Sequence, residues 1–403
     1  MPLIIVGVMY FVIGFGVGIS GFLTPALKSA FSLSTSESYL VIVALFSAFV
    51  IFGGPSGMVI KKFGYKLSMI IAFFIMAIGM LLFVPSAIFG SFPVFLIALF
   101  VGGIGNTLLQ AAVNPYVTLI GPKNSAVMRM SLMGIMNKSA WWVAPVFLSI
   151  FIDLQEVDIN DVIIPFYIVA GVLLVLGLFT YYSELPEVVA EGESDEEVID
   201  NASSIDDNKT SVYQYPHLLL GVLALFIYVG IETLPMTSII DFARATFGDG
   251  SDLAGYSKFV SIGLVLGYVF GAIAVPKYIS QTNVLILFSF IGIFSTFMLV
   301  LLPVQYAFYA LLLVSFANSL MWPSIWPLAI ADLGKFTKNG SSLLVTGIVG
   351  GAFIPLLYGL LVDGFKGTAE VASVGDYQSA YWILLPSYLY ILFFAVKGHK
   401  IRK

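Results

Sequence analysis

The chain has 403 residues, of which 59% are hydrophobic and 10% are charged, and its mean hydropathy is +1.01. A soluble globular domain carries about 25% charged residues, so this composition excludes a soluble protein and indicates an integral membrane protein. The net charge is −5 and there is no cysteine, which excludes disulfides, thiol catalysis and Cys-ligated metals.

A helix of about 20 apolar residues crosses the hydrocarbon core of a bilayer. Apolar runs between charged residues and Gly/Pro breaks predict twelve such helices, at residues 3–26, 38–60, 67–88, 93–119, 128–152, 162–182, 216–238, 254–276, 282–303, 306–331, 341–362 and 378–396. The first run shows no signal-peptide cleavage pattern, so we expect it to remain as a helix. The sequence therefore predicts an all-α membrane protein with twelve transmembrane helices.

Six predicted spans precede an acidic segment and six follow it. Residues 183–214 contain ten acidic residues and one Lys, a net of −9, so the rest of the chain carries −5 + 9 = +4. The segment is polar and poor in aromatic residues, as expected of a solvated linker. The predicted domains are an N-terminal six-helix bundle (1–182), an acidic cytoplasmic linker (183–214) and a C-terminal six-helix bundle with a basic tail (215–403).

Most Lys and Arg side chains fall in loops on the same side as both predicted termini. Positively charged loops stay on the cytoplasmic side of a membrane. We therefore expect a multi-pass protein of the cell (inner) membrane, with both termini and the linker in the cytoplasm.

The two halves of the chain resemble each other. NTLLQAAVNPY, which begins at Asn106, aligns with NSLMWPSIWPL, which begins at Asn318, at an offset of 318 − 106 = 212 residues. Equal halves that share such landmarks are typical of transporters built from parallel repeats. We expect two bundles related by a pseudo-two-fold axis, with the fourth span equivalent to the tenth.

Polar side chains line one face of the fourth span, where lipid could not satisfy them. Asn106, Gln110 and Asn114 recur every four residues and therefore share one face of a helix. The equivalent face of the tenth span carries one amide and two indole rings, from Asn318, Trp322 and Trp326.

Amides both donate and accept hydrogen bonds, and indole rings offer flat apolar faces. These properties suit the hydroxyl rim and the C–H faces of a sugar, so we expect the two faces to line a central sugar-binding cavity. The alternative is hydrogen bonding between packed helices, worth about 0.6–2 kcal/mol for each contact.

Two ionisable residues are predicted to lie well inside spans, Lys138 in the fifth and Glu232 in the seventh. A charge at the bilayer centre costs about 2.5–3.5 kcal/mol, so each of them needs water or a partner. We expect a cation-coupling pair in which Glu232 exchanges a proton or joins a sodium site. The alternative is a permanent salt bridge, or a lysine side chain that extends to the membrane surface. Asn137 and Trp141, which flank Lys138 on the same helix, are expected to join the substrate site.

With these motifs located, the sequence resembles the major facilitator superfamily, and within it the fucose/glucose–galactose permease family. The resemblance rests on NPYVTLIGP (Asn114–Pro122), SLMGIMNK (Ser131–Lys138), YVGIE (Tyr228–Glu232), NSLMWPSIWPLAI (Asn318–Ile330) and the run Leu333–Gly359. These motifs look most like the branch that contains glucose/galactose and N-acetylglucosamine permeases. The resemblance implies twelve helices, alternating access and sugar uptake coupled to a cation, usually a proton.

Two departures from fucose permeases concern proton coupling. Gly21 stands where they carry a titratable Asp, and Gln110 stands where they carry a Glu. Because neither residue titrates, the fucose-type proton sites cannot be carried over to this sequence. Glu232 remains as the acid expected to couple transport to a cation.

We therefore predict a secondary active transporter that imports a hexose, such as glucose or galactose, or an N-acetylhexosamine. The alternative is an uncoupled facilitator or an exporter of small amphiphilic solutes. An enzyme is not expected, because the sequence contains no catalytic motif. We expect no cofactor, no metal site and no nucleic-acid partner, and a monomer in the lipid bilayer.

Overall fold

The computed structural model describes residues 2–30, 35–151, 161, 163–188, 209–248 and 253–402. In these residues the regular secondary structure is helical throughout. Eight helical stretches of the described chain are long and apolar enough to cross a membrane, and two shorter apolar helices lie at Pro2–Gly16 and Lys258–Ala274. Residues 189–208, which make up most of the predicted linker, lie outside the described residues.

The first half of the chain forms the helices α1 (Pro2–Ala30), α2 (Thr35–Ile88), α3 (Phe92–Leu119), α4 (Ala126–Ser149) and α5 (Ile163–Tyr182). The predicted second and third spans both lie in α2, within which Gly64 departs from helical geometry with φ 76° and ψ 176°. Positive φ is unfavourable for residues with a Cβ, so glycine lets the chain turn between the two spans without strain.

The second half forms α7 (Pro216–Phe247), α8 (Leu253–Ala274), α9 (Gln281–Leu301), α10 (Val304–Ser319), α11 (Met321–Ile330), α12 (Thr337–Thr346), α13 (Gly350–Lys366), α14 (Val374–Ala380) and α15 (Leu384–Val396). The predicted tenth span is divided into α10 and α11 at Leu320. Pro323 follows in the first turn of α11, where a proline removes no hydrogen bond that the helix could make. The eleventh span is divided into α12 and α13 by a 3₁₀ turn over Gly347–Val349.

Contacts divide the chain into two compact units. Unit 1 contains Met1–Ile120, Ile135–Val212 and Asp332–Thr346, and unit 2 contains Gly121–Gly134, Tyr213–Ala331 and Gly347–Lys403. Each half of the chain gives one segment to the unit built mainly from the other half. The two segments are equivalent in the repeat, since 332 − 121 = 211 and 346 − 134 = 212. The division into bundles at 1–182 and 215–403 stays a prediction.

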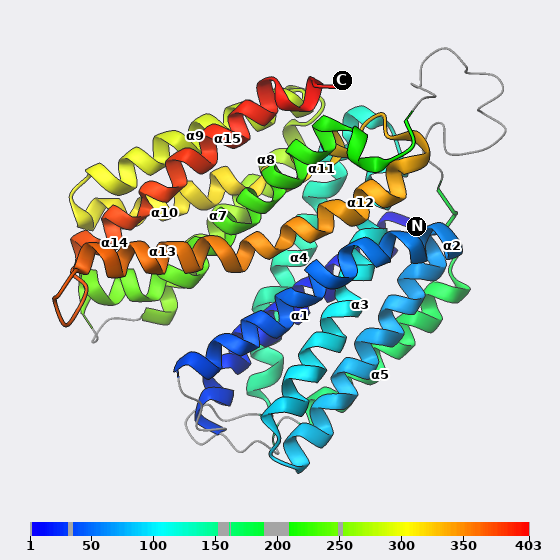
Figure 1. Ribbon diagram of the computed structural model, residues 1–403, viewed down its shortest axis with the longest axis horizontal. Coiled ribbons are helices and arrows are strands. Elements are labelled where there is room, and N and C mark those ends of the chain that lie inside the picture. Colours follow the sequence, from blue (N-terminus) through cyan, green and yellow to red (C-terminus); the bar gives the residue numbers. More distant parts are fainter. Residues whose placement is uncertain are drawn as a thin grey trace. The chain divides into compact units, whose positions relative to one another are not determined.

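In unit 1, α2 packs against α3 and α5, and α1 packs against α3 (Figure 1). Aromatic rings fill part of this core: the ring centroid of Phe83 lies 5.0 Å from that of Phe95 and 4.4 Å from that of Phe166. α12 packs on the first part of α2, so closely that a Cβ at Gly57 would lie 2.5 Å from Ser342 Oγ. Small residues therefore set the approach of α12 to α2.

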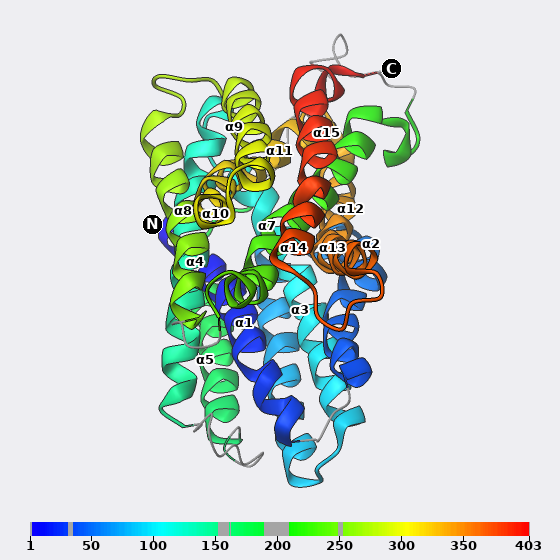
Figure 2. The ribbon, with the colours of Figure 1, turned by 90° about the vertical axis from the view of Figure 1, so that its left-hand side faces the viewer.

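In unit 2, α8 and α9 pack on α10, and α15 packs on α9 (Figure 2). The chain that leads into α4 belongs to this unit and is held by the first residue of α9. Gln281 Oε1 accepts a hydrogen bond from Val127 N at 3.2 Å, and Gln281 Nε2 donates one to Lys123 O at 2.8 Å. One side chain thus fixes the segment Gly121–Gly134 to unit 2.

A carboxylate from the chain after α5 binds the helix that resumes after Gly64. Glu187 accepts hydrogen bonds from the backbone N–H groups of Tyr65 and Lys66. These are N–H groups that a helix start leaves without an intrahelical partner, at the positive end of the helix dipole. Glu187 therefore caps the second half of α2.

Two further contacts hold the same stretch of chain. Lys66 Nζ donates a hydrogen bond to Ser183 O at 2.6 Å, and the Tyr116 hydroxyl donates one to Pro186 O at 2.8 Å. The beginning of the predicted linker is thus fixed to α2 and α3 in unit 1 and is not freely solvated.

Replacing Glu187 by Ala is expected to destabilise the protein by about 0.5–2 kcal/mol, the usual cost of removing a helix-capping side chain. The N–H groups of Tyr65 and Lys66 would then lose their carboxylate acceptor. Thermal unfolding of the purified protein in detergent measures the effect. Glu184→Ala is the matched control, because Glu184 is exposed and makes no hydrogen bond within the described chain. Equal losses of stability in the two variants would contradict the capping role.

Candidate functional site

The three amides on α3 are linked along the helix. Gln110 Nε2 donates to Asn106 Oδ1 at 3.2 Å, and Asn114 Nδ2 donates to the backbone oxygen of Gln110 at 2.8 Å. Asn106 and Gln110 are each 8% exposed and Asn114 is 1% exposed, so this face is packed within the protein and is not turned toward lipid. Among the described residues, Asn106 Nδ2 and Gln110 Oε1 have no hydrogen-bond partner. One donor and one acceptor are therefore left for a ligand.

Helices α1 and α4 reach the same face at Asn114. The Tyr10 hydroxyl of α1 donates a hydrogen bond to Asn114 Oδ1, and Asn137 Nδ2 of α4 donates one to Tyr10 O at 3.1 Å. The close approach of α4 requires Gly14, since a Cβ at that position would lie 2.0 Å from Asn137 O. The sequence prediction missed Tyr10. Its phenol hydroxyl within an apolar run, one turn before a glycine, is the signal that could have found it.

Lys138 has an aromatic neighbour in unit 1. Its side chain is 6% exposed, and Nζ lies 3.9 Å from the centroid of the Trp141 ring. A cation–π contact of this kind stabilises a partly desolvated ammonium group by about 0.5–2 kcal/mol. The buried indole N–H of Trp141 has no hydrogen-bond partner in the described part of the chain. The pairing of Lys138 with Glu232, which lies in unit 2, stays a prediction.

Asn318 connects three helices of unit 2. Its Nδ2 donates to Ile231 O of α7 at 2.8 Å, and its Oδ1 accepts a hydrogen bond from the Tyr388 hydroxyl of α15 at 2.8 Å. The residue is 1% exposed. Both polar atoms of the amide are therefore engaged in contacts between helices, and a contact of Asn318 with substrate stays a prediction.

The two tryptophans of α11 form an aromatic stack. The ring centroids of Trp322 and Trp326 lie 5.2 Å apart with an interplanar angle of 29°, and Tyr228 of α7 lies 6.2 Å from Trp322. Trp326 is fully buried, and its N–H has no partner among the residues described, whereas Trp322 is partly exposed. Tyr228 also contacts the side chain of Glu232. Trp322 is thus the partly exposed ring of this stack.

The structure brings the predicted site residues together in two groups. Unit 1 holds Asn106, Gln110, Asn114, Asn137, Lys138 and Trp141, and unit 2 holds Glu232, Asn318, Trp322 and Trp326. Each unit is described by itself, so the facing of the two groups across one cavity stays a prediction. The described residues contain no group of three or more His, Asp or Glu side chains that could hold a metal ion.

Known proteins resemble the chain over nearly its whole length. Residues 6–355 match the model of the Major Facilitator Superfamily. The chain is 31% identical to the glucose/galactose transporter of Brucella abortus over 401 residues, which cover 97% of this chain and 92% of that protein. It is 26% identical to the L-fucose-proton symporter of Escherichia coli over 397 residues, which cover 92% of this chain and 89% of the symporter.

The fold is shared with a solved transporter structure. FucP, in the outward conformation, matches with a TM-score of 0.79 and 23% sequence identity, over 98% of each chain. These likenesses confirm the predicted all-α, twelve-helix membrane fold and the predicted family. The chain therefore belongs to the major facilitator superfamily, in the family of the fucose and glucose/galactose permeases.

Proposed function

We propose that the chain imports a sugar, either a hexose such as glucose or galactose or an N-acetylhexosamine, together with a cation. The observation that carries this proposal is the amide face of α3, where Asn106 Nδ2 and Gln110 Oε1 lie one helical turn apart without a partner among the described residues. A sugar carries both hydrogen-bond donors and acceptors, so its polar groups can bind both atoms. The names of the relatives, a glucose/galactose transporter and a fucose-proton symporter, support this substrate class.

Transport against a gradient requires a group that binds a proton or another cation on one side of the membrane and releases it on the other. Glu232 is proposed for this role, with Lys138 as its cationic counterpart. An acid in the middle of a span is costly to insert. Glu232 contacts Tyr228, whose ring centroid lies 6.2 Å from that of Trp322 with an interplanar angle of 56°. A proton is the proposed coupling ion in preference to sodium, because one carboxylate can carry a proton without the several oxygen ligands of a sodium site.

Membership of the superfamily makes the chain a multi-pass membrane transporter and not an enzyme. Within that description we propose the inner membrane as its location, cytoplasmic termini and a monomeric working unit. The excess of Lys and Arg in the loops on the side of the termini supports this orientation.

Transport by the purified protein in liposomes tests the proposed function. Glucose, galactose and N-acetylglucosamine would be offered with a proton gradient and a sodium gradient imposed separately. The proposal expects accumulation of at least one sugar with the proton gradient. If the sugar only reaches equal concentrations inside and outside the liposomes, with either gradient, the protein is a facilitator. The absence of any sugar flux would contradict the proposal.

Trp322→Ala is expected to weaken sugar binding about 10-fold or more, whereas Trp322→Phe is expected to keep most of the affinity. Stacking of a flat ring is worth about 0.5–1.5 kcal/mol beyond the buried area, and phenylalanine retains a ring beside Tyr228 and Trp326. Isothermal titration calorimetry with each variant provides the measurement. Equal affinities for the two variants would argue against stacking of the sugar on this ring.

A further inference from the structure

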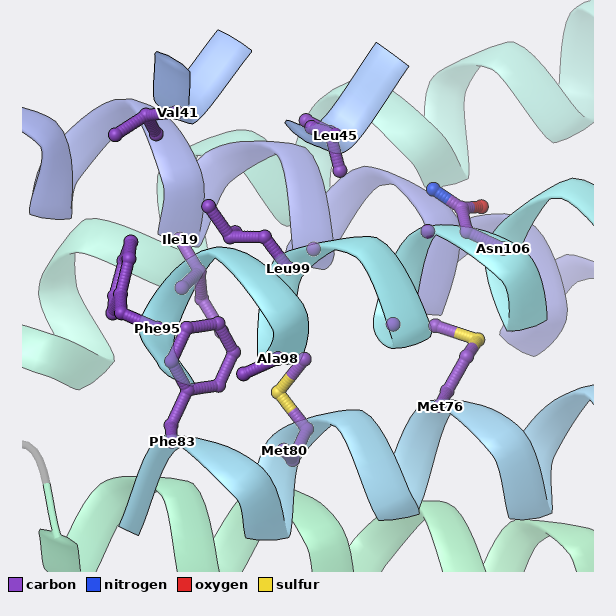
Figure 3. Close-up of a pocket in the computed structure, with 13 residues that line it drawn as sticks. Ile19, Val41, Leu45, Met76, Met80, Phe83, Phe95, Ala98, Leu99 and Asn106 are labelled. Carbon is purple, nitrogen blue, oxygen red and sulfur yellow. The ribbon is translucent and has the colours of Figure 1, made fainter. Parts of the chain in front are cut away.

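An apolar cavity lies inside unit 1, enclosed by α1, both halves of α2 and α3 (Figure 3). It is lined by Gly16, Ile19, Val41, Leu45, Met76, Met80, Phe83, Phe95, Ala98, Leu99, Gly102, Gly103 and Asn106. Its volume is about 50 Å³. One water-sized group needs about 10–15 Å³ in this measure, so the cavity has room for about three to five such groups.

Among the lining residues that the structure describes, Asn106 is the one with a polar side chain. Figure 3 shows its nitrogen on the side of Leu45 and Leu99 and its oxygen on the far side. The oxygen accepts the hydrogen bond from Gln110, whereas the nitrogen has no partner within the described residues. The described lining of the cavity therefore combines a single hydrogen-bond donor with otherwise apolar side chains.

This combination selects the chemistry of an occupant. A hydroxyl group placed deep among these aliphatic and aromatic side chains would lose the hydrogen bonds that it makes in water. Its transfer from water into the cavity would therefore cost free energy. A fitting group carries one acceptor oxygen for Asn106 next to a methyl group that fills the apolar space. An acetamido group, with one carbonyl oxygen, one methyl carbon and four heavy atoms in all, has this shape and size.

We propose that the cavity is a subsite for the acetamido group of an N-acetylated sugar, whose ring binds the adjoining amide face at Gln110. The proposal rests on the proposed sugar transport and narrows it to N-acetylhexosamines as preferred substrates over unsubstituted hexoses. Asn106 donates to the carbonyl oxygen, and the methyl group packs against the side chains beyond it. A hexose would leave the cavity unfilled.

Two glycines allow the cavity to be filled without disturbing its walls. Within the described residues, a Cβ at Gly16 would meet no atom within 4 Å, and a Cβ at Gly102 would meet only Met80 Cε, at 3.6 Å. Both lie in helices, where alanine is favoured over glycine by about 1 kcal/mol, so the fold should tolerate the double variant Gly16→Ala, Gly102→Ala. Gly54→Ala is the matched control: a Cβ there also meets nothing within 4 Å, but Gly54 does not line the cavity.

The test is a calorimetric titration of the full-length protein with N-acetylglucosamine and with glucose. The wild type and Gly54→Ala should bind N-acetylglucosamine at least about tenfold more tightly than glucose. The double variant should reduce the ratio of the two affinities, N-acetylglucosamine over glucose, about tenfold. One methylene group more or less in an apolar pocket changes discrimination between ligands by about 10–200-fold. Binding of glucose with no preference for N-acetylglucosamine, or a ratio unchanged in the double variant, would overturn the acetamido subsite alone. Binding of neither sugar would overturn the proposed function and the subsite with it.

A variant that enlarges the cavity gives a second and opposite readout. Met80→Ala removes a flexible side chain from the wall, and methionine positions tolerate substitution well. This variant should bind N-butanoylglucosamine more tightly than the wild type does, relative to N-acetylglucosamine. A preference between the two acyl chains that does not change with Met80→Ala would contradict the subsite.

Discussion

Replacing Gln110 by Ala is expected to lower sugar affinity by about 100-fold, enough to remove the binding signal in a calorimetric titration. The change deletes Gln110 Oε1, one of the two polar atoms on α3 that are open to a ligand, and also the donor that orients Asn106. Loss of a buried hydrogen-bond partner costs about 1–3 kcal/mol, and here both members of the pair are affected. The fold should persist, because Asn114 bonds the backbone oxygen of residue 110 and not its side chain.

A polar residue of α3 outside the amide face provides the control. In the described part of the chain, Thr107 bonds only the Gly103 backbone oxygen of its own helix, at 2.7 Å. Thr107→Val therefore keeps the size of the side chain and leaves the amide face intact. Thr107→Val should bind sugar as the wild type does, and both variants should elute as folded protein. Wild-type affinity in Gln110→Ala would show that the amides only join helices.

Replacing Glu232 by Gln is expected to abolish sugar accumulation driven by a gradient while exchange of internal for external sugar continues. The substitution preserves shape and hydrogen-bonding capacity but removes the proton that the carboxylate would carry. Exchange requires only that the loaded site alternates between the two sides, and net accumulation also requires the cation to be bound and released. Uptake into liposomes with and without a proton gradient, together with counterflow of labelled sugar, separates the two activities.

The same chemical change at an exposed acid serves as the control for Glu232. Glu370 is exposed and lies between α13 and α14, outside both helices, so Glu370→Gln should accumulate sugar normally. Accumulation that still follows the gradient in Glu232→Gln would remove Glu232 from the coupling mechanism.

Hydropathy located the membrane helices well but not their ends or their continuity. The span predicted at residues 216–238 is α7, yet the helix continues to Phe247, because a helix can extend past its apolar stretch, into a charged turn that contains Asp241 and Arg244. The spans on either side of Gly64 were predicted as separate helices, and the chain does form two helices that meet at a kink there. The tenth span was predicted as one helix but is divided into α10 and α11 at Leu320. Hydropathy indicates where lipid surrounds the chain, while backbone hydrogen bonds determine where a helix stops.

The sequence predicted which site residues share one helix face, but it did not predict the contacts that the site residues make with other helices. Spacing of four residues placed Asn106, Gln110 and Asn114 on one face, and the structure links them along α3. Tyr10 bonds Asn114 across 104 positions of sequence, and Tyr388 bonds Asn318 across 70 positions. No periodic pattern encodes such contacts, because they depend on how separate helices pack.

We propose that Gln110 and Trp322 are each reached by water, as sugar-binding residues must be, and the absence of cysteine from the chain allows a direct measurement. A cysteine introduced at position 110 or 322 (Gln110→Cys, Trp322→Cys) would be the only thiol. The nucleophile that attacks a thiol reagent is the thiolate, which forms in water and not in lipid. Val175, which is 64% exposed on α5, gives the lipid-facing control Val175→Cys. We predict that a membrane-impermeant thiol reagent modifies positions 110 and 322 much faster than position 175. Modification at 110 and 322 that is no faster than at position 175 would contradict this prediction.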